Sequence, residues 1–233
     1  MDIQKGIGLL DGLIKRLERS SRTLKSHPTI DQIERGELSL EQLRHFATQL
    51  YIGNKGHNAN ILGLIYAKCD DFGARRAIVE NLLEEELGRQ SGVGRSHMEL
   101  YLEFGEAIGI PRERLLRATM SADATAMVHW MYWLADSKPW YVTLAGISLG
   151  SELFNPDAYV RVVEGLRRHY KLNDDGVRFF TVHIEVDKDH GDSSAGSIFR
   201  AIPESAAAET LWAVEMHIEF MRRLWADINP SVA

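Results

Sequence analysis

Apolar residues recur at helical spacing along almost the whole chain, and this periodicity limits the fold more than any other feature. The stripe that runs from Leu43 through Phe46 to Leu50 is one example. Spacings of three and four residues place side chains on one face of an α-helix, whereas a half-buried strand needs alternation. No long alternating run of β-branched residues is present. The sequence therefore predicts an all-α bundle.

Start and stop signals divide this bundle into about seven to nine helices. Ser39 with Gln42, and Ser96 with Glu99, have the spacing of a capping box, so a helix is expected to begin at each serine. The first is expected to continue as one long helix, bent at its glycines, to about residue 64. The other expected helices are residues 7–20, 71–87, 112–136, 139–155, 157–170, 174–190 and 204–228, and the segment 112–136 is either one helix or a broken one.

Composition and charge exclude several classes of protein. A chain of 233 residues that is 45% hydrophobic suits a single domain over residues 1–233. The formal charge of −6 and the absence of a basic run argue against nucleic-acid binding. The lone Cys69 rules out an internal disulfide and suits a reducing compartment. No signal peptide or membrane-spanning stretch is recognisable, so we expect a cytoplasmic protein without membrane or nucleic-acid partners.

Three metal-type side chains share one helical stripe near the C-terminal third of the chain. His183, Asp187 and His190 fall at positions i, i+4 and i+7, on the same side as Phe179 and Phe180. Two imidazoles and a carboxylate are thus expected to point toward the apolar interior. A buried carboxylate without a partner is costly, and a metal cation is one of the few groups that stabilises it.

Further candidate ligands come from three other segments. His97 directly follows the cap at Ser96, and its stripe continues into apolar residues. Glu152 lies on a helix face rich in small residues that lets another helix approach. Glu85 and Glu86 each share a stripe with apolar residues, so periodicity alone leaves open which of them faces inward. Each of these residues, taken singly, also suits a hydrogen-bonded core or surface position.

Together, these side chains have the chemistry of a transition-metal site. Carboxylates and imidazoles without a cysteine ligand suit iron or manganese better than a structural zinc ion. Three of each are enough for two metals, a known solution in helical bundles. His57 also lies on an apolar stripe, as an additional ligand or pocket residue, and Tyr101 and Tyr141 are candidates for lining the pocket.

At this point the chain resembles a known family. The segments GELSLEQLRHFATQLY, ENLLEEELG, GVGRSHMELYLEFGEAIGI and FFTVHIEVDKDHG are similar to those of the haem-oxygenase-like di-iron oxidases and oxygenases. These iron-containing redox enzymes are relatives of the thiaminase-II and pyrroloquinoline-quinone-synthase folds. The family's pattern of Asn, Glu, Gly and a Ser-His pair matches Asn81, Glu85, Gly88, Ser96 and His97. This match selects Glu85 over Glu86.

The resemblance implies a haem-oxygenase-like bundle that holds two iron ions and uses dioxygen as co-substrate, with manganese as the alternative metal. Its ligand pattern matches Glu85, His97 and His183 for one iron, Asp187 and His190 for the other, and Glu152 to bridge or complete the set. The implied substrates are small amino-acid-like or fatty-acid-like molecules of specialised metabolism. The implied reactions are N-oxygenation, desaturation and oxidative C–C cleavage, and a homodimer is expected because fold relatives often pair.

The chain departs from the family pattern in two places. The loop between Glu85 and His97 is about two residues longer than usual. Many members also carry a carboxylate ligand on the first core helix, where this chain reads GNKGHNANIL. His57, Asn58 or Asn60 would have to replace that carboxylate, or one metal keeps an open position.

Two other functions compete with the di-iron enzyme. The first is a metal-free enzyme of the same fold, either a cofactorless oxidase or a thiaminase-II-like hydrolase with Cys69 as its nucleophile. No base that would activate Cys69 is evident in the sequence. The second is a non-catalytic helical interaction protein in which the acidic and histidine stripe is incidental.

Overall fold

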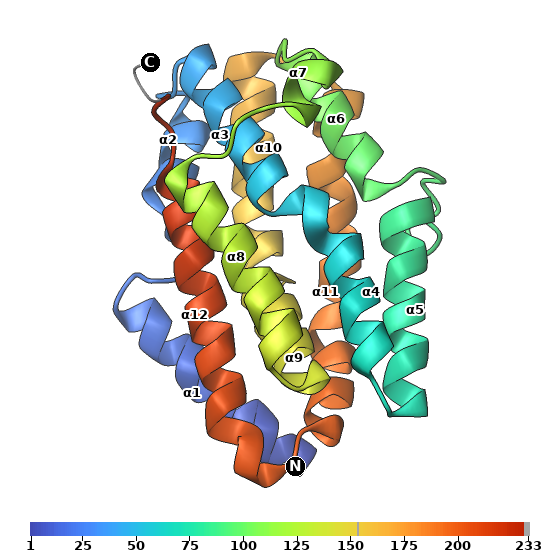
Figure 1. Ribbon diagram of the computed structural model, residues 1–233. Coiled ribbons are helices and arrows are strands. Elements are labelled where there is room, and N and C mark those ends of the chain that lie inside the picture. The colour runs from blue at the N-terminus through green and yellow to red at the C-terminus, as the bar shows by residue number, and fades with distance from the viewer. Residues whose placement is uncertain (153, 231–233) are drawn as a thin grey trace.

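The protein folds as a bundle of helices (Figure 1). The computed structural model describes the backbone of residues 1–152 and 154–230, and their side chains apart from residues 152 and 187–197. Within these residues there is no β-strand, so the predicted all-α class is confirmed. None of the described helices combines the length and hydrophobicity that crossing a membrane requires.

The helices follow one another with short connections. Their bounds are α1 Ile3–Arg19, α2 Pro28–Arg35, α3 Leu40–Gly53, α4 Asn58–Lys68, α5 Phe72–Leu87, α6 His97–Ala107, α7 Arg112–Leu116, α8 Ala122–Ser137, α9 Trp140–Glu152, α10 Asn155–Tyr170, α11 Asp174–Ala201 and α12 Ala207–Ala226. Two 3₁₀ helices, η1 Lys55–His57 and η2 Glu204–Ala206, precede α4 and α12.

The expected number of seven to nine helices was too low, because the segment expected to be one long helix is broken, and so is the segment 112–136, for which a break was left open. The segment that begins at Ser39 is divided by Asn54 and η1 into α3 and α4. The segment 112–136 is divided into α7 and α8 by residues 117–121. The short helix α2 was not expected, although Pro28 at its first position and Gly36 at its end are ordinary helix boundaries.

Both predicted capping boxes are present. The Ser39 hydroxyl accepts a hydrogen bond from the backbone of Gln42, and Ser96 does the same for Glu99. In each case the N3 side chain returns a bond to the backbone of the serine. These caps fix where α3 and α6 begin, and for α6 the first helical residue is His97.

Close approach of α9 and α12 brings a buried histidine to the end of α9. A Cβ atom on Gly146 would come within 3.1 Å of Ala213, and one on Gly150 within 3.0 Å of the His217 side chain. Only glycine lets the two backbones pack this tightly. Helix α12 therefore places His217 beside Ser151, at the end of α9.

Candidate metal centre

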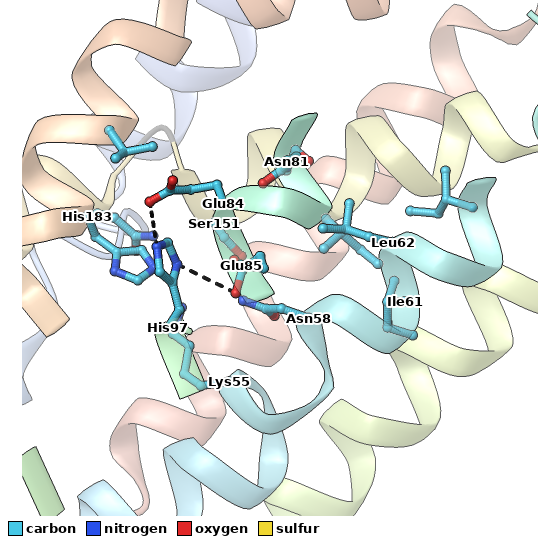
Figure 2. Close-up of a pocket in the computed structure, with 15 residues that line it drawn as sticks. Lys55, Asn58, Ile61, Leu62, Asn81, Glu84, Glu85, His97, Ser151 and His183 are labelled. Carbon is cyan, nitrogen blue, oxygen red and sulfur yellow. Dashed lines mark hydrogen bonds and ion pairs between the residues drawn. The ribbon is translucent and has the colours of Figure 1, made fainter. Parts of the chain in front are cut away.

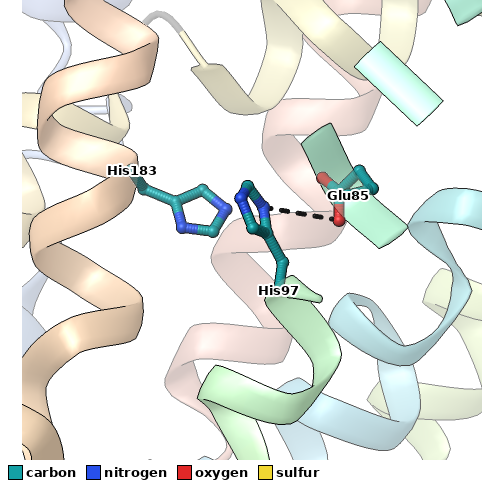
Figure 3. A group of neighbouring side chains, drawn as sticks. All are labelled: Glu85, His97 and His183. Atoms are coloured by element: carbon teal, nitrogen blue, oxygen red, sulfur yellow. Dashed lines mark ion pairs between the residues drawn. The ribbon is translucent and has the colours of Figure 1, made fainter. Parts of the chain in front are cut away.

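Three side chains from distant parts of the sequence meet in the interior (Figure 3). Glu85 comes from α5, His97 from the start of α6 and His183 from the middle of α11. One ligand atom from each lies within 4.8 Å of the other two. The centres of the His97 and His183 rings are 4.5 Å apart, and His97 Nδ1 is 3.5 Å from Glu85 Oε2. Both histidines are buried and Glu85 is half-buried, so the group has the reach and burial of a metal site.

The turn after α5 is what brings His97 close to Glu85. Gly88 ends α5 in the left-handed region, with φ of 55°. A Cβ atom there would lie 2.5 Å from the Arg95 carbonyl oxygen, so the loop can fold back on the helix end only because residue 88 is glycine. The Ser96 cap then starts α6 with His97 facing the last turns of α5.

Hydrogen bonding fixes which nitrogen of His183 faces the site. Its Nδ1 is 2.8 Å from the Phe179 carbonyl oxygen, which can only accept, so the Nδ1–H donates. The lone pair of the neutral ring is therefore on Nε2. Burial, followed by the positive charges of His97 and Lys55, holds the pKa of His183 well below its usual value. A neutral imidazole with a free Nε2 is the form that binds metals.

Glu84 orients His97, and sequence reasoning missed it. It is 1% exposed, and its Oε1 accepts a bond of 2.9 Å from His97 Nε2. Its Oε2 accepts from the backbone N–H groups of Gln90 and Ser91, at 2.5 and 3.0 Å. Burial raises the pKa of Glu84, but the bonds from Ser91, His97 and Gln90 outweigh it and lower the pKa. Glu84 is therefore an ionised acceptor that holds both His97 and the loop.

The remaining nitrogen of His97 fits a cation. Because Nε2–H donates to Glu84, Nδ1 is left as the atom facing Glu85, and it is buried without a geometrically sound hydrogen bond. Burial lowers the pKa of His97, but contact with Glu85 and Glu84 raises it more. The site thus favours a positive charge between Nδ1 and the carboxylate, and either a proton or a metal ion can supply it. Two nitrogens and a carboxylate suit iron or manganese.

A cavity of about 50 Å³ adjoins the three ligands (Figure 2). Its lining is partly apolar and partly polar. The apolar lining residues are Ile61, Leu62 and Ile65, which form an apolar wall on α4, together with Ile147 of α9 and Val186 of α11. The polar side chains, apart from the three ligands and Glu84, are Lys55, Asn58, Asn81, Ser148, Ser151 and Asn155. The space admits small molecules and single functional groups, such as dioxygen or a carboxylate.

The side chains of the other three predicted ligands, Glu152, Asp187 and His190, lie outside the described residues. Glu152 is the last residue of α9, directly after Ser151 on the cavity wall. Asp187 and His190 belong to α11, which is helical through Ala201 and so extends well past the expected end at residue 190. They stay predictions.

The additional candidates lie away from the cavity. The two ring nitrogens of His57 are 3.1 Å from the Tyr132 hydroxyl and 3.0 Å from the Ile52 carbonyl oxygen. Neither nitrogen is free for a metal, which corrects the expectation that His57 acts as a ligand or pocket residue. Tyr101 is fully buried and donates to the Ala47 carbonyl, and Tyr141 packs edge-on against Trp140. Neither tyrosine lines the cavity. Glu86 is exposed, so the structure favours Glu85 of that pair.

Cys69 has the environment of a structural thiol. It is 4% exposed, does not line the cavity and donates to the Asp71 carbonyl at 3.5 Å. Burial raises its pKa. A nucleophilic cysteine needs the opposite, a lowered pKa beside a base or a cation, so nothing at Cys69 favours the metal-free hydrolase.

Comparison with known proteins identifies relatives of both sequence and fold. Residues 44–222 match the profile of a family described as iron-containing redox enzyme. The 4-aminobenzoate synthase of Chlamydia pneumoniae is 30% identical over 184 residues, which is 79% of this chain and 77% of that protein. The enzyme of the same name from Nitrosomonas europaea is 27% identical over 203 residues, covering 80% and 78% of the two chains.

Solved structures show the same fold at low sequence identity. A CADD-like protein of unknown function from Nostoc punctiforme superposes with a TM-score of 0.76 at 16% identity, covering 97% of both chains. A TenA homologue from Pseudomonas syringae superposes with a TM-score of 0.75 at 14% identity, covering 94% of this chain and 91% of the other. A protein from Shewanella denitrificans described as having a haem-oxygenase-like fold gives 0.72 at 16% identity, with coverage of 97% and 89%. The predicted haem-oxygenase-like bundle is confirmed.

Proposed function

Since the chain belongs to the iron-containing redox enzyme family, we propose that it is an oxygen-dependent non-haem di-iron oxidase or oxygenase acting on a small amino-acid-like substrate. The observation that carries this proposal is the convergence of Glu85, His97 and His183 beside a cavity. The His97 Nδ1, the His183 Nε2 and a carboxylate oxygen face one another, and all three are metal-binding atoms.

Hydrogen bonds within the protein preorganise the two histidine rings for metal binding. The Phe179 carbonyl fixes the His183 ring, and Glu84 fixes the His97 ring. Such outer hydrogen bonds orient metal-binding histidines and raise their basicity. The same Glu84 carboxylate accepts hydrogen bonds from the backbone of Gln90 and Ser91, which fixes the position of the loop that leads to His97.

We assign the second iron to Asp187 and His190, with Glu152 as the bridging or completing ligand. Asp187 and His190 follow His183 by one and two turns on α11, and Glu152 ends α9 next to the cavity wall. When bound, iron at these positions supplies the electron transfer that activates dioxygen. The apolar wall formed by Ile61, Leu62 and Ile65 limits water in the adjoining space.

The names of the sequence relatives suggest which reaction to test first. Because relatives at about 30% identity are named 4-aminobenzoate synthases, formation of an aromatic amino acid such as 4-aminobenzoate is the leading candidate. N-oxygenation, desaturation and oxidative C–C cleavage of an amino acid are the other reactions within this class of chemistry.

The test is to load the protein with ferrous iron without oxygen and then expose it to oxygen with a panel of amino acids. We expect about two iron ions per chain, oxygen uptake, and a new product detected by mass spectrometry, with 4-aminobenzoate searched for specifically. Manganese loading is the parallel arm. His183→Ala should abolish iron binding and turnover while far-UV circular dichroism stays unchanged. Full turnover by His183→Ala, or by protein free of metal, would contradict the proposal.

A further inference from the structure

Lys55 lines the cavity, but the proposed metal centre assigns no role to it. It begins η1, in the break between α3 and α4, and is only 8% exposed. Its ammonium nitrogen lies 6.0 Å from the centre of the Tyr159 ring, and the residue lines the cavity beside Glu85 and His97 (Figure 2). Among the side chains that the structure describes, no carboxylate oxygen comes within 4.0 Å of this nitrogen.

A buried ammonium group without an anionic partner is unfavourable, because it has lost its hydration without gaining a countercharge. The positive charge of Lys55 also contributes to the lowered pKa of His217, which lies beside Ser151. Iron bound at His183 would add positive charge to the same cavity and increase the repulsion. An anion bound between the metal and Lys55 would provide a countercharge for the ammonium group and reduce its repulsion from the metal.

Ser151 offers a second donor on the same cavity. Trp130 Nε1–H donates to His217 Nδ1 at 3.3 Å, so the neutral His217 ring carries its proton on Nε2. That Nε2 lies 2.9 Å from Ser151 Oγ and donates to it. Because His217 cannot also take the serine proton, this pair is not a nucleophile and its base. The Ser151 hydroxyl accepts from His217 and keeps its own proton for a ligand in the cavity.

We propose that Lys55 and Ser151 bind the carboxylate of the amino-acid-like substrate and so position it in the cavity. The inference rests on the proposed function, since it concerns the same cavity. Ile61 and Leu62, on the apolar wall, would contact the hydrocarbon part. Lys55 stands in the GNKGHNANIL segment, which contains no carboxylate and has Lys55 as its one ammonium group.

The test compares acetate with acetamide, which have nearly the same shape and differ in charge, and both fit a cavity of about 50 Å³. Binding is measured by NMR titration on anaerobic, iron-loaded protein. We expect wild type to bind acetate at least about tenfold more tightly than acetamide, as a charge-assisted hydrogen bond allows. Lys55→Met should remove that preference, and Lys55→Arg should keep part of it. The exposed Lys15, changed to Met, is the matched control and should behave as wild type.

The melting temperature provides a second readout, and its direction separates binding from a structural role. If Lys55 is unpaired in the free protein, Lys55→Met should raise the melting temperature, because it removes a buried charge. A lower melting temperature would mean that a carboxylate of the protein itself pairs with Lys55, and would overturn the inference. Acetate binding that is equal in wild type and Lys55→Met would overturn it too, because the metal alone would then hold the anion.

A third variant guards against misfolding of Lys55→Met. Ser151→Ala removes one donor and no charge, and should weaken acetate binding by about threefold to tenfold while acetamide binding changes less. Unchanged acetate binding in Ser151→Ala would show that the Ser151 hydroxyl does not bind the carboxylate. Iron content is measured on every sample. Wild type without iron would contradict the proposed function, whereas wild type with iron but without an acetate preference would contradict this inference alone.

Discussion

At the scale of single residues, Glu84 contacts His97 with one carboxylate oxygen and the 88–95 loop with the other. It is not among the three side chains that converge on the candidate metal site, yet it determines which nitrogen of His97 faces Glu85. Glu84 and Glu85 are neighbours in sequence with different partners, because consecutive helical residues point about 100° apart.

We expect Glu84→Gln to weaken iron binding by about tenfold to a hundredfold, the usual effect of losing a partner that orients a metal-binding histidine. A neutral amide can still occupy the space, so the helical content should be unchanged. Glu86→Gln alters the exposed neighbour and serves as the control. The measurement is a competition titration of ferrous iron against a chelator. Equal iron affinity in the two variants would show that Glu84 does not act through His97.

Sequence reasoning reached part of this site. Glu85, His97 and His183 could be proposed from helical stripes and family motifs, and the structure brings them together. Glu84 was missed because its partners are backbone N–H groups of a loop, and periodicity describes helix faces only. His57 was misjudged for a related reason. Its apolar stripe is real, but the break at η1 turns its ring toward Tyr132 and the Ile52 carbonyl.

At the scale of secondary-structure elements, the starts of α3 and α6 were predictable from local sequence, whereas the break between α3 and α4 was not. Ser39 and Ser96 cap the starts of α3 and α6 through hydrogen bonds between side chains and nearby backbone groups. These bonds involve only residues that are neighbours in sequence. The division of α3 from α4 depends on tertiary packing. Gly53, for example, lies so close to α8 that a Cβ atom would be 2.9 Å from Ala124.

The two capping boxes provide a matched pair of variants. Ser39→Ala and Ser96→Ala should each lower the free energy of unfolding by about 1 kcal/mol, as the loss of an N-cap does. Only Ser96→Ala should also weaken iron binding, because α6 begins with His97. Chemical denaturation and iron titration of both variants check this. If iron affinity falls equally in both, the cap acts through general stability rather than through the position of His97.

At the scale of the whole molecule, buried neutral histidines make stability depend on pH. Burial lowers the pKa of His217 to about 3, and burial with the charge of Arg222 lowers that of His27 to about 4. In the unfolded chain these histidines take up protons near the ordinary histidine pKa of 6.5, whereas in the folded protein they do not. The stabilisation from keeping His217 and His27 neutral is therefore complete above pH 6.5. It is lost progressively as the pH falls toward their pKa values in the folded protein.

We expect each of these two histidines to reduce the free energy of unfolding by about 2 kcal/mol between pH 7.5 and pH 5. His217→Gln should remove its share of this loss, although it also lowers stability at neutral pH. His129→Gln, at an exposed position, should leave the pH dependence as in wild type. Denaturant unfolding of iron-free protein at the two pH values measures the difference. A pH dependence that is the same in His217→Gln and wild type would show that His217 is not held neutral.

The central claim is that Glu85, His97 and His183 hold an iron ion. The most direct test is an anomalous difference map, recorded at the iron absorption edge, from crystals loaded with ferrous iron without oxygen. We predict a peak within bonding distance of His97 Nδ1, His183 Nε2 and a Glu85 oxygen, with a second peak beside Asp187, His190 and Glu152. Full iron loading with no peak among Glu85, His97 and His183 would contradict the account.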